Sequence, residues 1–130
     1  MILQTTLSLS ATAILINLWL GLRVVRVRLK AQILHGDGSN PLLMQRMRAQ
    51  ANFIENTPLT LILIAAIEMT GKGGTWLAIA GALHMAARVA HGLGMDNPST
   101  NPLRGGGFGI SLMVTLGLAV VAVLIALGLF

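Results

Sequence analysis

The fold is decided by the stretch Arg48-Ala-Gln-Ala-Asn52-Phe-Ile-Glu55-Asn-Thr-Pro58, which leads directly into the apolar run 59–67. Arg48, Asn52 and Glu55 stand at i, i+4 and i+7, so their side chains project from one face of a helix. Ionisable groups at the edge of a membrane helix are costly and are usually functional. This face therefore predicts either a site for a polar or charged ligand or a set of polar partners inside the protein.

The chain as a whole is strongly apolar. Of its 130 residues, 55% are hydrophobic and 10% are charged, whereas a soluble domain carries roughly 25% charged residues. A helix needs about 20 residues to cross a bilayer, so the length suits four crossings without a separate soluble domain. The chain has no cysteine, which excludes disulfides, thiolate metal sites and a thiol nucleophile supplied by the protein.

We expect one all-α membrane domain over residues 1–130, formed by a bundle of four transmembrane helices. Their expected bounds are about 2–28, 41–70, 75–95 and 107–130. The first helix should remain as an anchor, because no cleavage site of a signal peptide is evident. Asn40 and Pro41 suit the start of the second helix, and Thr75 can cap the third.

Positive charge gathers at two of the three expected connections. The basic residues that flank the first connection are Arg23, Arg26, Arg28, Lys30, Arg46 and Arg48. Arg88 and Arg104 flank the third, and the second has only Lys72. The positive-inside rule then places the first and third connections in the cytoplasm and both termini on the opposite side. The simplest interpretation of Arg23, Arg28, Lys30 and Arg46 is a belt that meets lipid phosphates.

Four arginines, Arg26, Arg48, Arg88 and Arg104, are expected to converge on that membrane face. Their excess positive charge would attract an anion, and the guanidinium fork suits carboxylates. The alternative is a structural network in which Glu55 pairs with Arg88 or Arg48. The spacing alone leaves both interpretations open.

The third expected helix carries His84, Arg88 and His91 on one stripe. A metal site is disfavoured there, because the arginine between the histidines opposes a cation. His84 is expected to hydrogen-bond between helices, and His91 could touch a ligand.

Arg104 stands just ahead of the fourth expected helix, followed by three glycines at 105–107. The partial positive charge of a helix N-terminus would help such an arginine to stabilise a thiolate or carboxylate. Alternatively the glycines form a flexible hinge beside a solvated arginine.

These residues together resemble the MAPEG superfamily, the membrane-associated proteins of eicosanoid and glutathione metabolism. Residues 48–58 are similar to the family pattern R-x-x-x-N-x-x-E-x-x-P, and Ala87–His91 and Val25–Arg28 also fit. The resemblance covers nearly the whole chain and is greatest to the short bacterial members. It implies a homotrimer of four-helix subunits in the bacterial inner membrane, with glutathione bound between neighbouring subunits near the cytoplasmic face.

The resemblance also implies roles for individual residues. Arg48, Asn52 and Glu55 would hold glutathione, with Glu55 meeting its amino group. Arg104 aligns with the arginine that stabilises the glutathione thiolate. The remaining residues expected at the glutathione site are Arg88 and His91 and, reaching it from the adjacent subunit, Gln50 and Arg26.

The sequence departs from the family at several aromatic positions. Met95 and Phe108 stand where some members have tyrosine, and Ala51 replaces an arginine of some members. Gly105 replaces a serine of the prostaglandin branch, which argues against prostaglandin synthesis.

The implied function is that of a membrane-bound glutathione transferase, with glutathione peroxidase activity as a second reaction. Glutathione is the cosubstrate, and the partner is a hydrophobic electrophile or lipid hydroperoxide that enters from the membrane lipid between the first and fourth helices. Neither a metal nor a nucleic acid is expected. Two alternatives remain: a non-catalytic protein with the same fold, and a small-molecule transporter, which an arginine-rich pocket disfavours because it repels cations.

Overall fold

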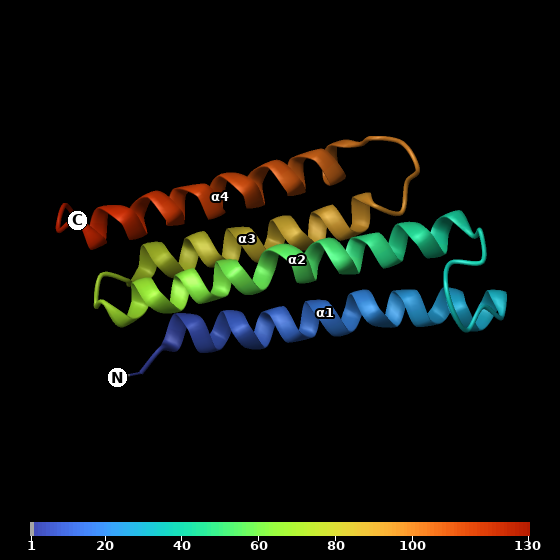
Figure 1. Ribbon diagram of the computed structural model, residues 1–130, viewed down its shortest axis with the longest axis horizontal. Helices are drawn as coiled ribbons and strands as arrows, with labels where there is room; N and C mark the ends of the chain where they lie inside the picture. The colour runs from blue at the N-terminus through green and yellow to red at the C-terminus, as the bar shows by residue number, and fades with distance from the viewer. Residues whose placement is uncertain (1) are drawn as a thin grey trace.

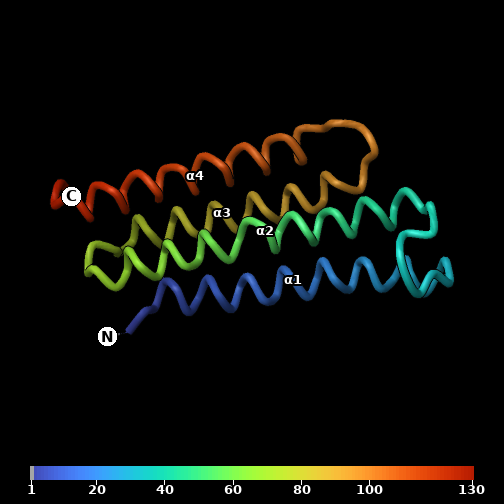
Figure 2. The backbone as a smooth tube through the Cα atoms, viewed as in Figure 1, coloured from blue at the N-terminus to red at the C-terminus, as the bar shows by residue number. Residues whose placement is uncertain are grey.

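The computed structural model describes residues 2–130 and contains four long helices within them (Figure 1). Their bounds are α1 Gln4–Ala31, α2 Pro41–Met69, α3 Thr75–Gly94 and α4 Pro102–Ala126. The helices lie side by side, and α2 and α3 lie between α1 and α4 (Figure 1). The connections α1–α2 and α3–α4 meet at one end of the bundle, while both termini and the α2–α3 connection lie at the other (Figure 2). The basic connections therefore share one end.

The start of α2 is as the sequence predicts. Pro41 occupies the first turn, and the Asn40 side chain accepts a hydrogen bond from the Leu43 N–H at 3.0 Å. The expectation for α3 is wrong in one detail. Thr75 is the first helical residue and not the cap, which is Gly74 in a backbone conformation with φ of 114° that a side chain would strain. No side-chain hydrogen bond caps this helix.

Helix α4 begins at Pro102, several residues before the expected start near 107. The Asn101 side chain caps it by accepting the Arg104 N–H at 3.0 Å. The three glycines therefore lie inside the helix and are not a hinge. Of the three, only Gly107 is tightly packed: a Cβ atom there would lie 2.5 Å from the Ala87 carbonyl oxygen. Glycine is needed here because α3 and α4 pack backbone to backbone.

At the opposite end, a carboxylate from α2 caps α1. Glu68 accepts hydrogen bonds from the backbone N–H groups of Thr5 and Thr6, both at 2.8 Å, and from the Thr6 hydroxyl at 2.7 Å. No side-chain cap is present at Leu3, the residue before the helix. Glu68 therefore satisfies free N–H groups and the positive end of the α1 dipole.

The surface of the bundle suits lipid. Helices α1 and α4 are long and apolar enough to cross a membrane by length and composition. Large apolar side chains such as Leu15, Met113 and Val120 are exposed along them. Helices α2 and α3 were not found long and apolar enough by the same measure. Crossing by all four helices remains a prediction.

Candidate functional site

A polar cavity of about 440 Å³ opens between α2, α3 and α4 at the end where the basic connections meet. We call it the α2–α4 cavity. Arg48 and Asn52 of α2, His91 of α3 and Arg104 of α4 line it, with Met95 and Phe108. The structure thus brings together four of the residues that the sequence indicated. No acidic side chain of the described residues lines the cavity.

Arg104 and His91 are coupled at the start of α4. The His91 Nδ1 atom lies 3.1 Å from the Arg104 carbonyl oxygen. Because a carbonyl oxygen can only accept, Nδ1 must carry the proton and the neutral ring leaves Nε2 as an acceptor. Nε2 is buried and has no partner among residues 2–130. The contact with the Arg104 carbonyl therefore fixes the orientation of the His91 ring against the start of α4.

Arg88 lies behind the cavity and fixes the orientation of Asn52. Its side chain is almost completely buried, with 2% of the residue exposed. It donates one hydrogen bond to Asn52 Oδ1 and a second, at 3.0 Å, to the Ser111 hydroxyl. Since Oδ1 is already engaged, the Asn52 amide presents its N–H donors to a ligand. Arg88 is therefore a positioning residue and not part of the cavity wall.

No carboxylate in the described part of the chain pairs with Arg88 or Arg48. The pair with Glu55 that the structural alternative required is absent, because Glu55 is exposed on α2 and its carboxylate makes no ion pair or hydrogen bond with the described residues. A buried cation with only neutral partners leaves positive charge uncompensated. That charge favours an anion in the neighbouring cavity.

The acid that does form ion pairs is Asp96, just after α3. Its carboxylate accepts from Arg23 and, at 3.3 Å, from the Arg46 Nε atom. Arg23 also donates to the Gly92 carbonyl at 3.1 Å and stacks over Trp19, with 4.8 Å between its guanidinium carbon and the ring centroid. This cluster ties α1, α2 and α3 together.

The lipid-facing belt predicted for these arginines is therefore wrong for Arg23, which is 6% exposed, and for the half-buried Arg46. A signal for Arg23 was present in the sequence, because it continues the buried stripe Ile16, Leu20 and Val27 at helical spacing. Arg28 also turns inward and donates to the Gly36 carbonyl at 2.8 Å, which holds the first connection in place.

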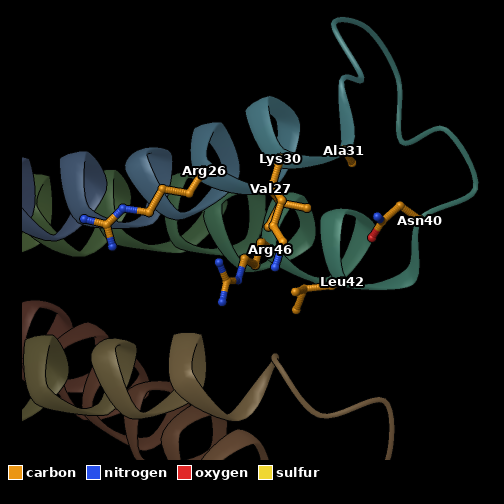
Figure 3. Close-up of a pocket in the computed structure, with 7 residues that line it drawn as sticks. All are labelled: Arg26, Val27, Lys30, Ala31, Asn40, Leu42 and Arg46. Carbon is orange, nitrogen blue, oxygen red and sulfur yellow. The ribbon is translucent and has the colours of Figure 1, made fainter.

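Besides Arg88, three of the predicted site residues lie outside the cavity in a single subunit. Gln50 donates to Asn17 Oδ1 at 3.3 Å, across to α1. Arg26 lines a different cavity, between α1 and α2 (Figure 3). Glu55 lies on the outer surface of α2. Gln50 and Arg26 were expected to act from an adjacent subunit.

His84 is not the interhelix hydrogen bonder that was expected. The residue is 1% exposed, and neither ring nitrogen has a hydrogen-bond partner within the described chain. It lines a small cavity of about 50 Å³ together with Asn56, Ser111 and Thr115. Its position on the stripe with Arg88 and His91 gave no sign that it would lack a partner.

A helical bundle with an apolar surface and polar residues gathered at one end is typical of an integral membrane protein. The chain belongs to the MAPEG family, whose sequence profile matches residues 6–124. This confirms the resemblance derived from residues 48–58 and makes the protein a membrane protein of that family.

Two curated relatives are similar to the chain. They are the inner membrane protein YecN of Escherichia coli strain K12 and the protein of the same name from E. coli O6:H1 strain CFT073. Each is 33% identical over 75 residues, which is 57% of this chain and 56% of the relative. The matched stretch thus spans little more than half of the relatives.

Proposed function

We propose that this protein is a membrane-bound glutathione transferase that binds glutathione in the α2–α4 cavity and holds its thiol ionised. The observation that carries the proposal is the cavity itself, in which Arg48 and Arg104 face one space with Asn52 and His91. Glutathione brings two carboxylates, one ammonium and one thiol. Two guanidinium groups without a lining acid match this excess of negative charge.

Arg104 is the residue proposed to face the sulfur. It lies in the first turn of α4, where the helix dipole adds partial positive charge. A cation beside sulfur favours the thiolate, and only the thiolate attacks electrophiles. Arg48, one turn ahead of Asn52 on α2, is proposed to bind a carboxylate.

The ammonium requires an acid, and Glu55 is proposed to supply it. Glu55 follows Asn52 by three residues, so both side chains lie on neighbouring positions of the α2 surface. It lies outside the cavity of one subunit, as do Gln50 and Arg26. A site completed between subunits of a homotrimer would use all three, which supports the trimer proposed for the family.

The proposed reaction is a substitution. The thiolate sulfur forms a bond to an electrophilic carbon of a hydrophobic substrate, and the leaving group departs with the electron pair of the broken bond. With a lipid hydroperoxide, the thiolate sulfur instead forms a bond to a peroxide oxygen as the O–O bond breaks, and the departing alkoxide takes up a proton to become the alcohol. The glutathione sulfenic acid left behind then reacts with a second glutathione thiol to give the disulfide and water. The apolar substrate is proposed to enter from lipid along the uncharged surfaces of α1 and α4 in the bacterial inner membrane, with the basic connections in the cytoplasm.

The experiment is a glutathione titration of the purified protein in detergent, followed by turnover of a chlorinated aromatic substrate. We expect saturable glutathione binding and glutathione-dependent release of chloride. Lys72 lies at the opposite end of the bundle, so a Lys72→Ala variant is the matched control for surface charge. Binding without turnover would identify a non-catalytic member of the family, and absence of binding would refute the proposal.

A further inference from the structure

Met95 brings a thioether side chain to the wall of the α2–α4 cavity, and the proposed transferase reaction gives it no role. The chain has no cysteine and seven methionines, so its own sulfur chemistry is that of thioethers. Among the described methionines, only Met95 lines this cavity, together with Arg48, Arg104 and Phe108. An oxidisable side chain therefore lines the cavity that is proposed to admit hydroperoxides.

The end of α3 holds Met95 in a fixed place. Its backbone N–H donates to the His91 carbonyl at 3.0 Å, and the residue is the C-cap of α3. Gly94 packs so closely against the Arg104 backbone that a side chain there would collide with the first turn of α4. Met95 is 9% exposed, and it packs into the hydrophobic core. The cavity is therefore the route by which a reagent reaches this side chain.

Two other methionines have different surroundings and serve for comparison. Met85 is 3% exposed in the core, and Met113 is 69% exposed on the outer face of α4. Neither of them lines the α2–α4 cavity. If exposure alone controlled oxidation, Met113 would react fastest and Met95 would behave nearly like Met85.

The cations of the cavity favour oxidation at Met95. In this reaction the sulfur lone pair forms a bond to the terminal peroxide oxygen as the O–O bond breaks. The departing alkoxide takes the proton of the transferred hydroxyl, so the sulfur is oxidised to a sulfoxide and the peroxide is reduced to an alcohol. Arg48 and Arg104 stabilise the negative charge that develops on the leaving oxygen. Among the described residues, no acid lines the cavity to oppose them.

The same cations would hold the oxidised side chain. A sulfoxide is polar and its oxygen accepts hydrogen bonds, whereas a thioether sulfur is only a weak acceptor. The guanidinium groups of Arg48 and Arg104, which line the cavity, can only donate. A sulfoxide at position 95 would therefore compete with an anionic ligand for these donors.

We propose that Met95 is a site of oxidative modification, at which an organic hydroperoxide that enters the α2–α4 cavity converts the thioether to a sulfoxide and so weakens glutathione binding. The oxidation depends on the cavity and its cations, and only the effect on glutathione rests on the proposed function. Reduction of the sulfoxide by a separate reductase would restore the site. The modification thus switches off a cavity that glutathione does not occupy.

The oxidation is tested by peptide mass spectrometry of the purified protein in detergent after treatment with cumene hydroperoxide, without glutathione. The readout is the gain of one oxygen atom at each methionine. We expect Met95 to be oxidised several-fold faster than the exposed Met113, and Met85 to stay reduced. In Arg104→Ala, the oxidation of Met95 should slow by on the order of tenfold, with that of Met113 and Met85 unchanged. A rate at Met95 no higher than at Met113, or one that Arg104→Ala does not change, would overturn the assignment.

A glutathione titration tests the consequence. The treated parent should bind glutathione about tenfold more weakly than the untreated parent, because the sulfoxide diverts a charged donor. Met95→Leu is close to methionine in volume and has no sulfur, so its affinity should be the same before and after treatment. Met85→Leu is the matched control and should lose affinity as the parent does. Equal losses in the parent and in Met95→Leu would place the effect at another residue and overturn the switch.

The two proposals fail in different ways. If the untreated parent binds no glutathione, the proposed transferase is refuted. The relative oxidation rates of Met95, Met85 and Met113 are measured without glutathione and still decide whether Met95 is the modified residue.

Discussion

Two cavities lined by basic residues flank α2 at the same end of the bundle, one between α1 and α2 and the other between α2, α3 and α4. Arg46 lines the cavity between α1 and α2, and Arg48, two residues later, lines the α2–α4 cavity. The Asp96 carboxylate pairs with Arg46, whereas no carboxylate of the described residues pairs with Arg48. In the α2–α4 cavity, Arg88 orients the neutral Asn52 side chain, and the Arg104 carbonyl contacts His91. An arginine with a counter-charge and an arginine without one therefore lie on opposite sides of α2.

The largest expected effect is that of Arg104→Ala on the cavity. Loss of the cation beside the sulfur should lower kcat by about 10²- to 10³-fold, the range for removal of one charge-stabilising donor. Glutathione should still bind, because Arg48 and Asn52 remain. Steady-state kinetics and a binding titration separate these effects. A fall in glutathione affinity as large as that in kcat would contradict the role of Arg104 at the sulfur.

An Asp96→Asn variant tests the ion pairs that Asp96 forms with Arg23 and Arg46. The substitution leaves Arg23 buried without a counter-charge, and we expect the free energy of unfolding to fall by about 2 kcal/mol. The figure is below that for a fully buried pair because the Asp96 side chain is 34% exposed. Thermal unfolding in detergent measures it. Asp37→Asn in the first connection is the matched control, and equal stability of the two variants would show that the Asp96 cluster contributes nothing.

A Glu55→Gln variant tests whether Glu55 binds the ammonium group of glutathione. We expect roughly tenfold weaker glutathione binding, since the ammonium loses its only proposed acid. Glu68→Gln is the matched control: it should lower stability by about 1 kcal/mol through the α1 cap, with glutathione affinity unchanged. Isothermal titration calorimetry measures the glutathione affinity of both variants. Equal affinity in Glu55→Gln and the parent would remove Glu55 from the site.

The smallest expected effect is that of His84→Phe. Removing two buried ring nitrogens without partners should raise the free energy of unfolding by about 1 kcal/mol. His35→Phe, in the exposed first connection, serves as the control and should leave stability unchanged. A clear loss of stability in His84→Phe would mean that the imidazole has a partner in the membrane-embedded protein.

Much of the fold could be predicted from local chemistry. Asn40 and Pro41 fixed the start of α2, and the glycine-rich connection at 71–74 separated α2 from α3. The start of α4 was mispredicted because glycine indicates flexibility in a sequence. Here Gly107 lies inside the helix, where the backbone of α3 leaves no room for a side chain. Local sequence patterns do not reveal such a contact between distant segments.

The candidate site was also only partly predictable from the sequence. Spacing placed Arg48 and Asn52 on one face, the stripe on the third helix indicated His91, and the position of Arg104 ahead of the fourth helix indicated a contact with an anion. The hydrogen bonds from Arg88 to Asn52 and Ser111 could not be predicted, because they depend on how α3 packs against α2 and α4. The inward turn of Arg23 could have been predicted from the buried stripe of α1, on which it lies.

The central claim is that guanidinium groups around one cavity hold a bound thiol in its ionised form. The direct measurement is the ultraviolet difference spectrum of the protein saturated with glutathione, recorded at a pH where free glutathione is almost entirely protonated. We expect a thiolate absorption band in the parent protein that disappears in Arg104→Ala at equal glutathione occupancy. A saturated parent protein without that band, or a band of equal strength in Arg104→Ala, would contradict it.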